Sequence, residues 1–337
     1  MDWERLFAEF RDLGGVAENV RLGEGPFGRG IFVVDPAKPA TLHASENLLV
    51  LVDDVEIRNG QMMVKAESSL GPREREFFQN FQRYFGWGAG LFDELWRSQT
   101  EWSRLPPEVI LAITNIGALE DPDRRFLPPT VELCLYAFVR TRYFTNRAKP
   151  YLAPVVELGN HSSSAAGYVV KDGIGLTGKF DDEVFGRYNL GDSIGHALYS
   201  SFSDRAVFAH SLAVTVDIDG QKRISVARDI NVHDLHDGIR YPRVTRDGST
   251  IHLPFLVLGF TAAPDVPRAV FRKILSSDLT APRADETFDT IAHFNRTKFL
   301  DLLRILDKYD TPLIRMLKEA AINQLETLSY CVGARSL

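Results

Sequence analysis

The chain has 337 residues, of which 45% are hydrophobic and 25% are charged, and its formal net charge is −6. These values are typical of a folded globular chain with one or two domains, and they exclude a disordered tail, a collagen-like chain and a coiled coil. The negative charge argues against non-specific nucleic-acid binding, so we expect no nucleic-acid partner.

Cysteine usage and the start of the chain indicate a reducing compartment. The two cysteines, Cys134 and Cys331, are too few and too far apart for a disulfide framework or a cysteine zinc cluster. The first residues lack the apolar run of a signal peptide, and runs such as Leu48–Val52 and Leu253–Leu258 are far too short to span a membrane. The sequence therefore predicts a cytoplasmic protein with no membrane partner.

The first half of the chain predicts strands followed by a helical block. Residues 3–13 predict a helix because apolar residues recur at helical spacing before two glycines. Residues 16–60 predict strands and turns, and Asn59-Gly60 is typical of a hairpin turn. Residues 66–147 predict helices, and we interpret their many aromatic side chains as core residues.

The second half predicts short strands and then helices. Residues 151–216 predict strands and loops, and Asp219-Gly220 predicts a hairpin within a β segment at 211–261. Residues 285–332 predict two helices, the second of which starts at Thr311. Because the regular strand–helix alternation of doubly wound folds is missing, the sequence predicts an α+β fold.

Three segments carry glycines or polar side chains suited to a ligand. Gly25–Gly30 precedes a strand, which is the opposite order from glycine loops that bind phosphate. An apolar run ends in Asn160–Ser162, and a second run ends in Tyr188 after the acids 181–183, which predict a solvated turn. Taken alone, each segment is more typical of a turn or of structural side chains than of a ligand site.

Taken in this order, the segments resemble the SET-domain protein lysine methyltransferases, most closely the branch typified by the Rubisco large-subunit methyltransferase. The stretches that carry the resemblance are Gly28-Arg29-Gly30 before a strand, the helical insertion at 66–147, Arg140–Arg142, Asn160–Ser162 and Val184–Tyr188. The resemblance covers most of the chain in order.

The resemblance implies a SET-type β-rich catalytic domain at residues 1–210, with the helical insertion at about 66–147. A C-terminal substrate-binding domain would follow at residues 211–337, beginning with a hairpin and ending in helices. The implied activity is transfer of a methyl group from S-adenosylmethionine to a lysine of a protein substrate.

The resemblance also implies roles for individual residues. Tyr188 would be the catalytic residue that orients the lysine amine, and Tyr199 and Phe202 would line the substrate channel. The residues implied to hold S-adenosylmethionine are Gly28, Arg29, Gly30, Arg142, Asn160 and His161. Among these, the glycines would let the backbone approach the cofactor and the arginine would pair with its carboxylate. No metal is implied.

Two positions depart from the family pattern. Asn189 follows Tyr188 where the family often has glycine or aspartate. A serine stands where the tyrosine of a Tyr-Gly-Phe motif would align, because Tyr199 is shifted. These departures favour, as an alternative, a SET-fold binding or scaffold protein with little or no catalysis.

A hydrolase is the second alternative. Gly191–Gly195 matches the Gly-x-Ser-x-Gly pattern around Ser193, although the strands and helices of a hydrolase elbow are missing around it. His233–Asp237 gathers two histidines and two carboxylates, residue types that bind metals, although so short a cluster is also typical of a polar turn.

Overall fold

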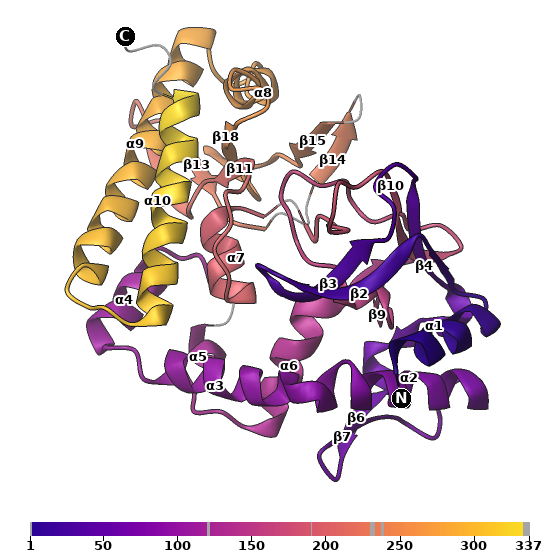
Figure 1. Ribbon diagram of the computed structural model, residues 1–337. Helices are drawn as coiled ribbons and strands as arrows, with labels where there is room; N and C mark the ends of the chain where they lie inside the picture. The colour runs from indigo at the N-terminus through magenta and orange to yellow at the C-terminus, as the bar shows by residue number, and fades with distance from the viewer. Residues whose placement is uncertain (1, 120–121, 190, 230–232, 237–238, 333–337) are drawn as a thin grey trace. The chain divides into compact units, whose positions relative to one another are not determined.

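The computed structural model describes residues 2–119, 122–189, 191–229, 233–236 and 239–332 (Figure 1). The chain divides into two compact units. The first unit combines Met1–Ser103 with Leu127–Asn189, and the second combines Arg104–Phe126 with Leu190–Leu337.

The first unit surrounds small antiparallel sheets with helices. Its strands are β1 (Val16–Glu18), β2 (Val20–Gly25), β3 (Gly28–Val33), β4 (Ala40–Ser45), β5 (Val50–Leu51), β6 (Val55–Arg58), β7 (Gln61–Val64), β8 (Phe144–Asn146), β9 (Lys149–Leu152) and β10 (Gly173–Gly178). They form the sheets β1-β4-β10, β2-β3, β5-β9-β8 and β6-β7. Both residues of the predicted Asn59-Gly60 turn have positive φ and join β6 to β7, so this turn is confirmed.

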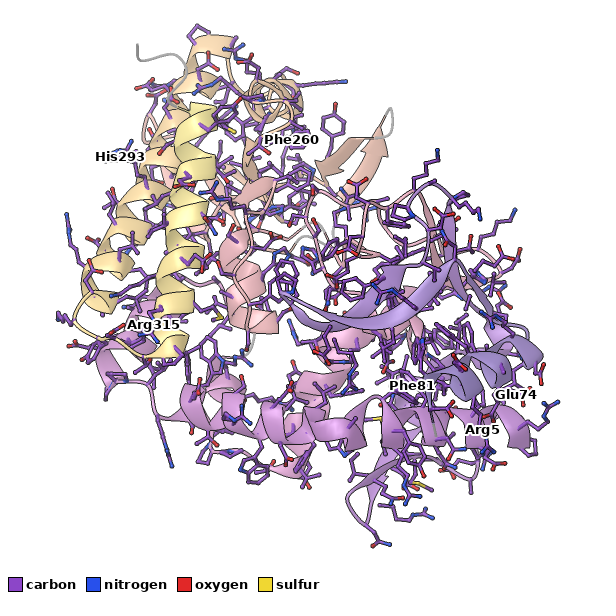
Figure 2. All side chains as sticks on the ribbon, viewed as in Figure 1. Arg5, Glu74, Phe81, Phe260, His293 and Arg315 are labelled. Atoms are coloured by element: carbon purple, nitrogen blue, oxygen red, sulfur yellow. The ribbon has the colours of Figure 1, made fainter. Side chains whose placement is uncertain are left out.

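The helices of the first unit are α1 (Trp3–Asp12), α2 (Pro72–Tyr84), α3 (Phe92–Ser103) and α6 (Val131–Arg142). Asp2 caps α1 by accepting a hydrogen bond from the backbone nitrogen of Arg5, and buried Phe10 stacks on Phe77 of α2 with ring centroids 6.0 Å apart. Phe81 of α2 is also fully buried (Figure 2). The aromatic side chains of α2 therefore fill a core, as predicted.

The second unit packs helices against a mixed set of strands. Its strands are β11 (Phe208–His210), β12 (Val214–Ile218), β13 (Lys222–Val226), β14 (His233–His236), β15 (Ile239–Pro242), β16 (Thr245–Asp247), β17 (Thr250–Leu253) and β18 (Val257–Phe260). They form the sheets β12-β13-β17-β16, β11-β18 and β14-β15. The predicted Asp219-Gly220 hairpin joins β12 to β13, and both turn residues have positive φ.

The helices of the second unit are α4 (Pro107–Asn115), α5 (Pro122–Arg125), α7 (Ser193–Ser200), α8 (Val266–Ile274), α9 (Ala281–Leu306) and α10 (Pro312–Val332). The two long C-terminal helices were predicted, and they pack side by side (Figure 1). Their outer positions include the exposed side chains of His293 and Arg315 (Figure 2). The sequence interpretation missed α7 and α8.

The structural division of the chain differs from the predicted boundary near residue 210. The second unit already includes α7 and β11, because α7 packs on α10 and β11 pairs with β18. It also takes in Arg104–Phe126 from the expected helical insertion, since α4 packs on α9. The assignment of a catalytic and a substrate-binding domain stays a prediction.

Helices and small sheets thus form an α+β fold, as the sequence predicts at that level. Among the helices of the described residues, none combines the length and the apolar character needed to cross a bilayer.

Candidate functional site

Residues 183–188, called the Tyr188 segment below, form backbone hydrogen bonds with several different parts of the first unit. Val184 donates its backbone N–H to the carbonyl of Ile31 in β3 at 2.7 Å, and Gly186 donates to the carbonyl of Asn160 at 3.0 Å. Because the partner changes along the segment, it forms isolated bridges rather than a continuous ladder. The predicted strand Val184–Tyr188 is therefore wrong as a regular strand, although its position beside Asn160 fits the expected site.

Tyr188 joins this segment to the polar Asn-His segment through two hydrogen bonds. Its hydroxyl donates to the carbonyl of Gly159 at 2.7 Å, and its backbone N–H donates to Nδ1 of His161 at 3.1 Å. Tyr188 is 37% exposed as a whole residue, but the surroundings of its hydroxyl remove that group from water and raise its pKa to about 12, against the charge of Arg142. The hydroxyl therefore stays protonated at neutral pH.

His161 has a defined role in this arrangement. Since Nδ1 accepts the hydrogen bond from Tyr188, the neutral imidazole carries its proton on Nε2. Nε2 lies 3.1 Å from the hydroxyl of Ser163. The ring of His161 therefore fixes the backbone of Tyr188 rather than lying apart from it.

Asn160 connects the site to the glycine-containing strand β3. Its side-chain nitrogen donates to Oε1 of Glu183 at 2.6 Å and to the carbonyl of Arg29 at 3.2 Å. A Cβ atom on Gly30 would lie 2.3 Å from the same carboxylate oxygen and 2.7 Å from the Asn160 nitrogen. The space beside Gly30 is thus filled by two side chains of the protein, which corrects the simple expectation of an open approach there.

Gly28 differs from Gly30 in what surrounds it. Its φ of +83° is in the region that favours glycine, and among the described residues no atom lies within 4 Å of where its Cβ would be. The backbone beside Gly28 is therefore open. Between the two glycines, Arg29 directs its guanidinium to the carbonyl of Phe85 at 3.3 Å.

Glu183 is buried, in contrast to the two acids before it. Asp181 and Asp182 are exposed, as a solvated turn requires, whereas Glu183 keeps only 6% of its surface exposed. Burial raises the pKa of Glu183, and the hydrogen bond from Asn160 opposes this shift. The prediction of a solvated turn is therefore wrong for the last of the three acids.

Arg142, which is half-buried, and Glu157, which is buried, are two further ionisable groups of the first unit. Arg142 ends α6, its guanidinium lies 4.7 Å from the ring centre of Phe138, and it donates to the hydroxyl of Thr141 at 2.7 Å. Glu157 accepts a hydrogen bond from Gln82 at 2.8 Å, while its other oxygen has no partner among the described residues. Burial raises the pKa of Glu157 to about 7, against the effects of Gln82 and Arg142.

Tyr168 is a site residue that the sequence interpretation missed. Its ring lies 6.4 Å from that of Tyr188, and its hydroxyl is buried with no hydrogen-bond partner among the described residues. A Cβ on Gly186 would lie 2.6 Å from this hydroxyl, so the tyrosine covers the backbone that leads to Tyr188. The available signal was a single aromatic residue after the small residues at 162–167.

The two predicted channel residues belong to the second unit. The hydroxyl of Tyr199 donates to the carbonyl of Ala118 at 2.9 Å, and Phe202 stacks on His196 with ring centroids 5.3 Å apart. The other predicted site residues all lie in the first unit. A shared site for both sets therefore stays a prediction.

The residues behind the hydrolase alternative have different environments. Ser193 is fully buried in the first turn of α7, and its hydroxyl accepts a hydrogen bond from the backbone of Ala206 at 3.1 Å. An exposed nucleophile is what a hydrolase elbow requires, so this burial argues against Ser193 in that role. The side chains of the His233–Asp237 cluster lie outside the described residues.

Comparison of the sequence with models of known protein families finds no matching family, and comparison with curated proteins finds no matching relative.

Proposed function

We propose that the first unit is a SET-type site that transfers a methyl group from S-adenosylmethionine to a lysine side chain of a protein. The observation that carries the proposal is the joining of Tyr188 to Gly159 and His161, directly beside Asn160. In the predicted family arrangement these residues lie in two separate motifs that meet at the reaction site.

The residues of the first unit fit the chemistry of this cofactor. The amino-acid end of S-adenosylmethionine carries an ammonium and a carboxylate, and the site offers a guanidinium at Arg142 and polar groups at Asn160 and His161. The open backbone beside Gly28 suits close approach of a ligand. When bound, the cofactor supplies an activated methyl group on a sulfonium.

The protein's own task is to present a neutral lysine amine in line with that methyl group. A free lysine has a pKa of about 10.4, so the site must favour the uncharged form by removing water from the amine. The hydroxyl of Tyr188 donates to Gly159, which leaves its oxygen lone pairs to accept from the amine. Because its pKa is about 12, the hydroxyl orients the amine and does not act as a base at neutral pH.

Tyr168 offers a further hydroxyl beside Tyr188. Since this hydroxyl has no partner among the described residues, a bound amine or a water would satisfy it. The tyrosine of the Tyr-Gly-Phe motif is replaced by a serine in this chain. Tyr168 nevertheless supplies a second aromatic ring and hydroxyl in the first unit.

Calorimetric titration with S-adenosylmethionine tests the binding step. We expect saturable binding to the native protein, and Asn160→Ala should weaken it at least about 10-fold because it removes hydrogen bonds to Glu183 and Arg29. Asn115→Ala, at an exposed position of α4, is the control and should bind normally. No binding at millimolar cofactor would contradict the proposal.

Transfer of a labelled methyl group to the lysines of a protein extract tests the chemical step. Tyr188→Phe should keep cofactor binding within about 3-fold but lower transfer at least about 100-fold, because only the orienting hydroxyl is lost. The matched control is Tyr330→Phe, an exposed tyrosine of α10. Cofactor binding without transfer by the native protein would instead favour the scaffold alternative.

A further inference from the structure

Glu183 is a buried acid of the first unit that the proposed mechanism leaves unused, and Glu157 is another. It lies where β3 and the Tyr188 segment meet, since Phe32 and Glu183 form a bridge between the two. Only 6% of the surface of Glu183 is exposed. An ionised carboxylate in such a position is costly unless a positive charge or several hydrogen bonds compensate it.

The protein itself supplies only part of that compensation. One oxygen of Glu183 accepts from Asn160, while no lysine, arginine or histidine of the described residues forms an ion pair with it. The charge that affects its pKa is that of another acid, Asp182, which makes the negative form still less favourable. A ligand cation would therefore be stabilised here.

Two glycines of the β2–β3 hairpin, Gly25 and Gly30, lie next to this carboxylate. A Cβ on Gly30 would collide with Oε1, and a Cβ on Gly25 would lie 3.4 Å from Oε2. Both oxygens therefore lie next to backbone that has no side chain. Side chains at these two positions would displace the carboxylate or screen it from a ligand.

Asn160 adds a hydrogen-bond acceptor, its side-chain oxygen, beside the carboxylate of Glu183. Its nitrogen is engaged by Glu183 and by the carbonyl of Arg29, and its side-chain oxygen accepts no hydrogen bond from the residues that the structure describes. Carboxylate and amide oxygens without competing donors suit a primary ammonium, which has three N–H donors and no acceptor.

We propose that Glu183 is the anionic partner of the α-ammonium group at the amino-acid end of the cofactor. The inference rests on the proposed function and extends it to a residue that the family resemblance did not single out. Arg142 and Glu183 then provide opposite charges for the two charged groups of an α-amino acid. Both charges act on the pKa of Tyr188, which Arg142 lowers and Glu183 raises.

Binding of three related compounds to Glu183→Gln tests this assignment. S-Adenosylmethionine and S-adenosylhomocysteine both carry the ammonium, whereas 5′-methylthioadenosine lacks the whole amino-acid end. Glutamine keeps an oxygen to accept from Asn160 but loses the charge. We expect the variant to bind the first two about 10- to 100-fold more weakly, by similar factors, and to bind 5′-methylthioadenosine as the native protein does.

Asp182→Asn is the matched control, because it removes the same charge from the neighbouring exposed position. It should leave the affinity for all three compounds unchanged. Thermal unfolding without ligand checks that Glu183→Gln is folded.

The remaining outcomes separate this inference from the proposed function. Native-like affinity of Glu183→Gln for both amino-acid-bearing compounds would overturn the inference and leave the proposed function standing. Weakened binding of S-adenosylmethionine alone would assign Glu183 to the sulfonium and overturn the ammonium assignment. Equal weakening for 5′-methylthioadenosine would indicate a general structural role and also overturn it. Failure of the native protein to bind S-adenosylmethionine would remove both proposals.

Discussion

The two units bury carboxylates in opposite ways. In the second unit, Asp192 caps α7 through the backbone nitrogen of Gly195 and also accepts from Arg228, from Gln324 and from the backbone of His210. Burial alone would raise the pKa of Asp192, but the charges of Arg228 and His210 and these hydrogen bonds outweigh it and lower the pKa to about 2.

In the first unit, Glu157 and Glu183 each accept one side-chain hydrogen bond from the residues that the structure describes, from Gln82 and from Asn160 respectively. Burial prevails, and the pKa of both carboxyl groups is raised, to about 7 for Glu157. A buried acid with a full set of partners stabilises its fold, whereas a buried acid with an incomplete set is a candidate for ligand binding. Four substitutions, two at buried acids and two at tyrosines, test how partnered and unpartnered groups affect stability.

The largest effect is expected for Asp192→Asn. The substitution leaves Arg228, whose side chain is only 15% exposed, without its counter-charge, and such losses cost about 3–5 kcal/mol. Denaturant unfolding of the full chain measures this. Asp301→Asn, which breaks the exposed pair with Arg304, is the control and should change the stability by less than about 1 kcal/mol.

The same carboxylate predicts an acid sensitivity. Because the folded-state pKa of Asp192 is depressed, its stabilising contribution is present above pH 3.8 and is lost as the pH falls toward about 2. Asp192→Asn should therefore differ less from the native protein at acid pH. An equal difference across that range would contradict the assignment of Asp192 as a partnered, ionised group.

A smaller effect of opposite sign is expected for Glu157→Gln. The folded state holds a proton that the unfolded state loses between pH 4.5 and about 7, so the native protein loses stability as the pH rises through this window. The variant lacks this loss and should be more stable at pH 8, by up to about 3 kcal/mol. Unfolding at pH 5 and pH 8 measures the difference.

The exposed Glu319→Gln is the control for that experiment and should keep the pH profile of the native protein. If Glu157→Gln also kept the native profile, Glu157 would not be the half-partnered acid described above.

The smallest effect is expected for the paired tyrosines of the first unit. Tyr168→Phe removes a buried hydroxyl without a partner among the described residues and should stabilise the protein by about 1 kcal/mol. Tyr188→Phe removes the hydrogen bond to Gly159 and should destabilise it by about the same amount. Thermal unfolding measures the stability of both variants. Effects of the same sign would contradict the description of the Tyr168 hydroxyl as unpartnered and the Tyr188 hydroxyl as hydrogen-bonded.

Local signals in the sequence predicted several elements well. The Asp219-Gly220 turn, the helix start near Thr311 and the amphipathic N-terminal helix depend on residues close together in the chain, and the structure confirms them. The short helices α7 and α8 were missed, since α7 contains a glycine and several small residues and α8 begins beside Pro267, a residue type that is also common in loops.

The sequence by itself determined which motif residues are present and in what order: a glycine hairpin, then an Asn-His pair, then a tyrosine. Their identity and order can be read without knowing the fold. It did not determine that Glu183 is buried while Asp181 and Asp182 are exposed, or that the hydroxyl of Tyr168 is buried beside the Tyr188 segment. Burial depends on segments that are distant in sequence, so only the tertiary structure decided which of the three acids is buried.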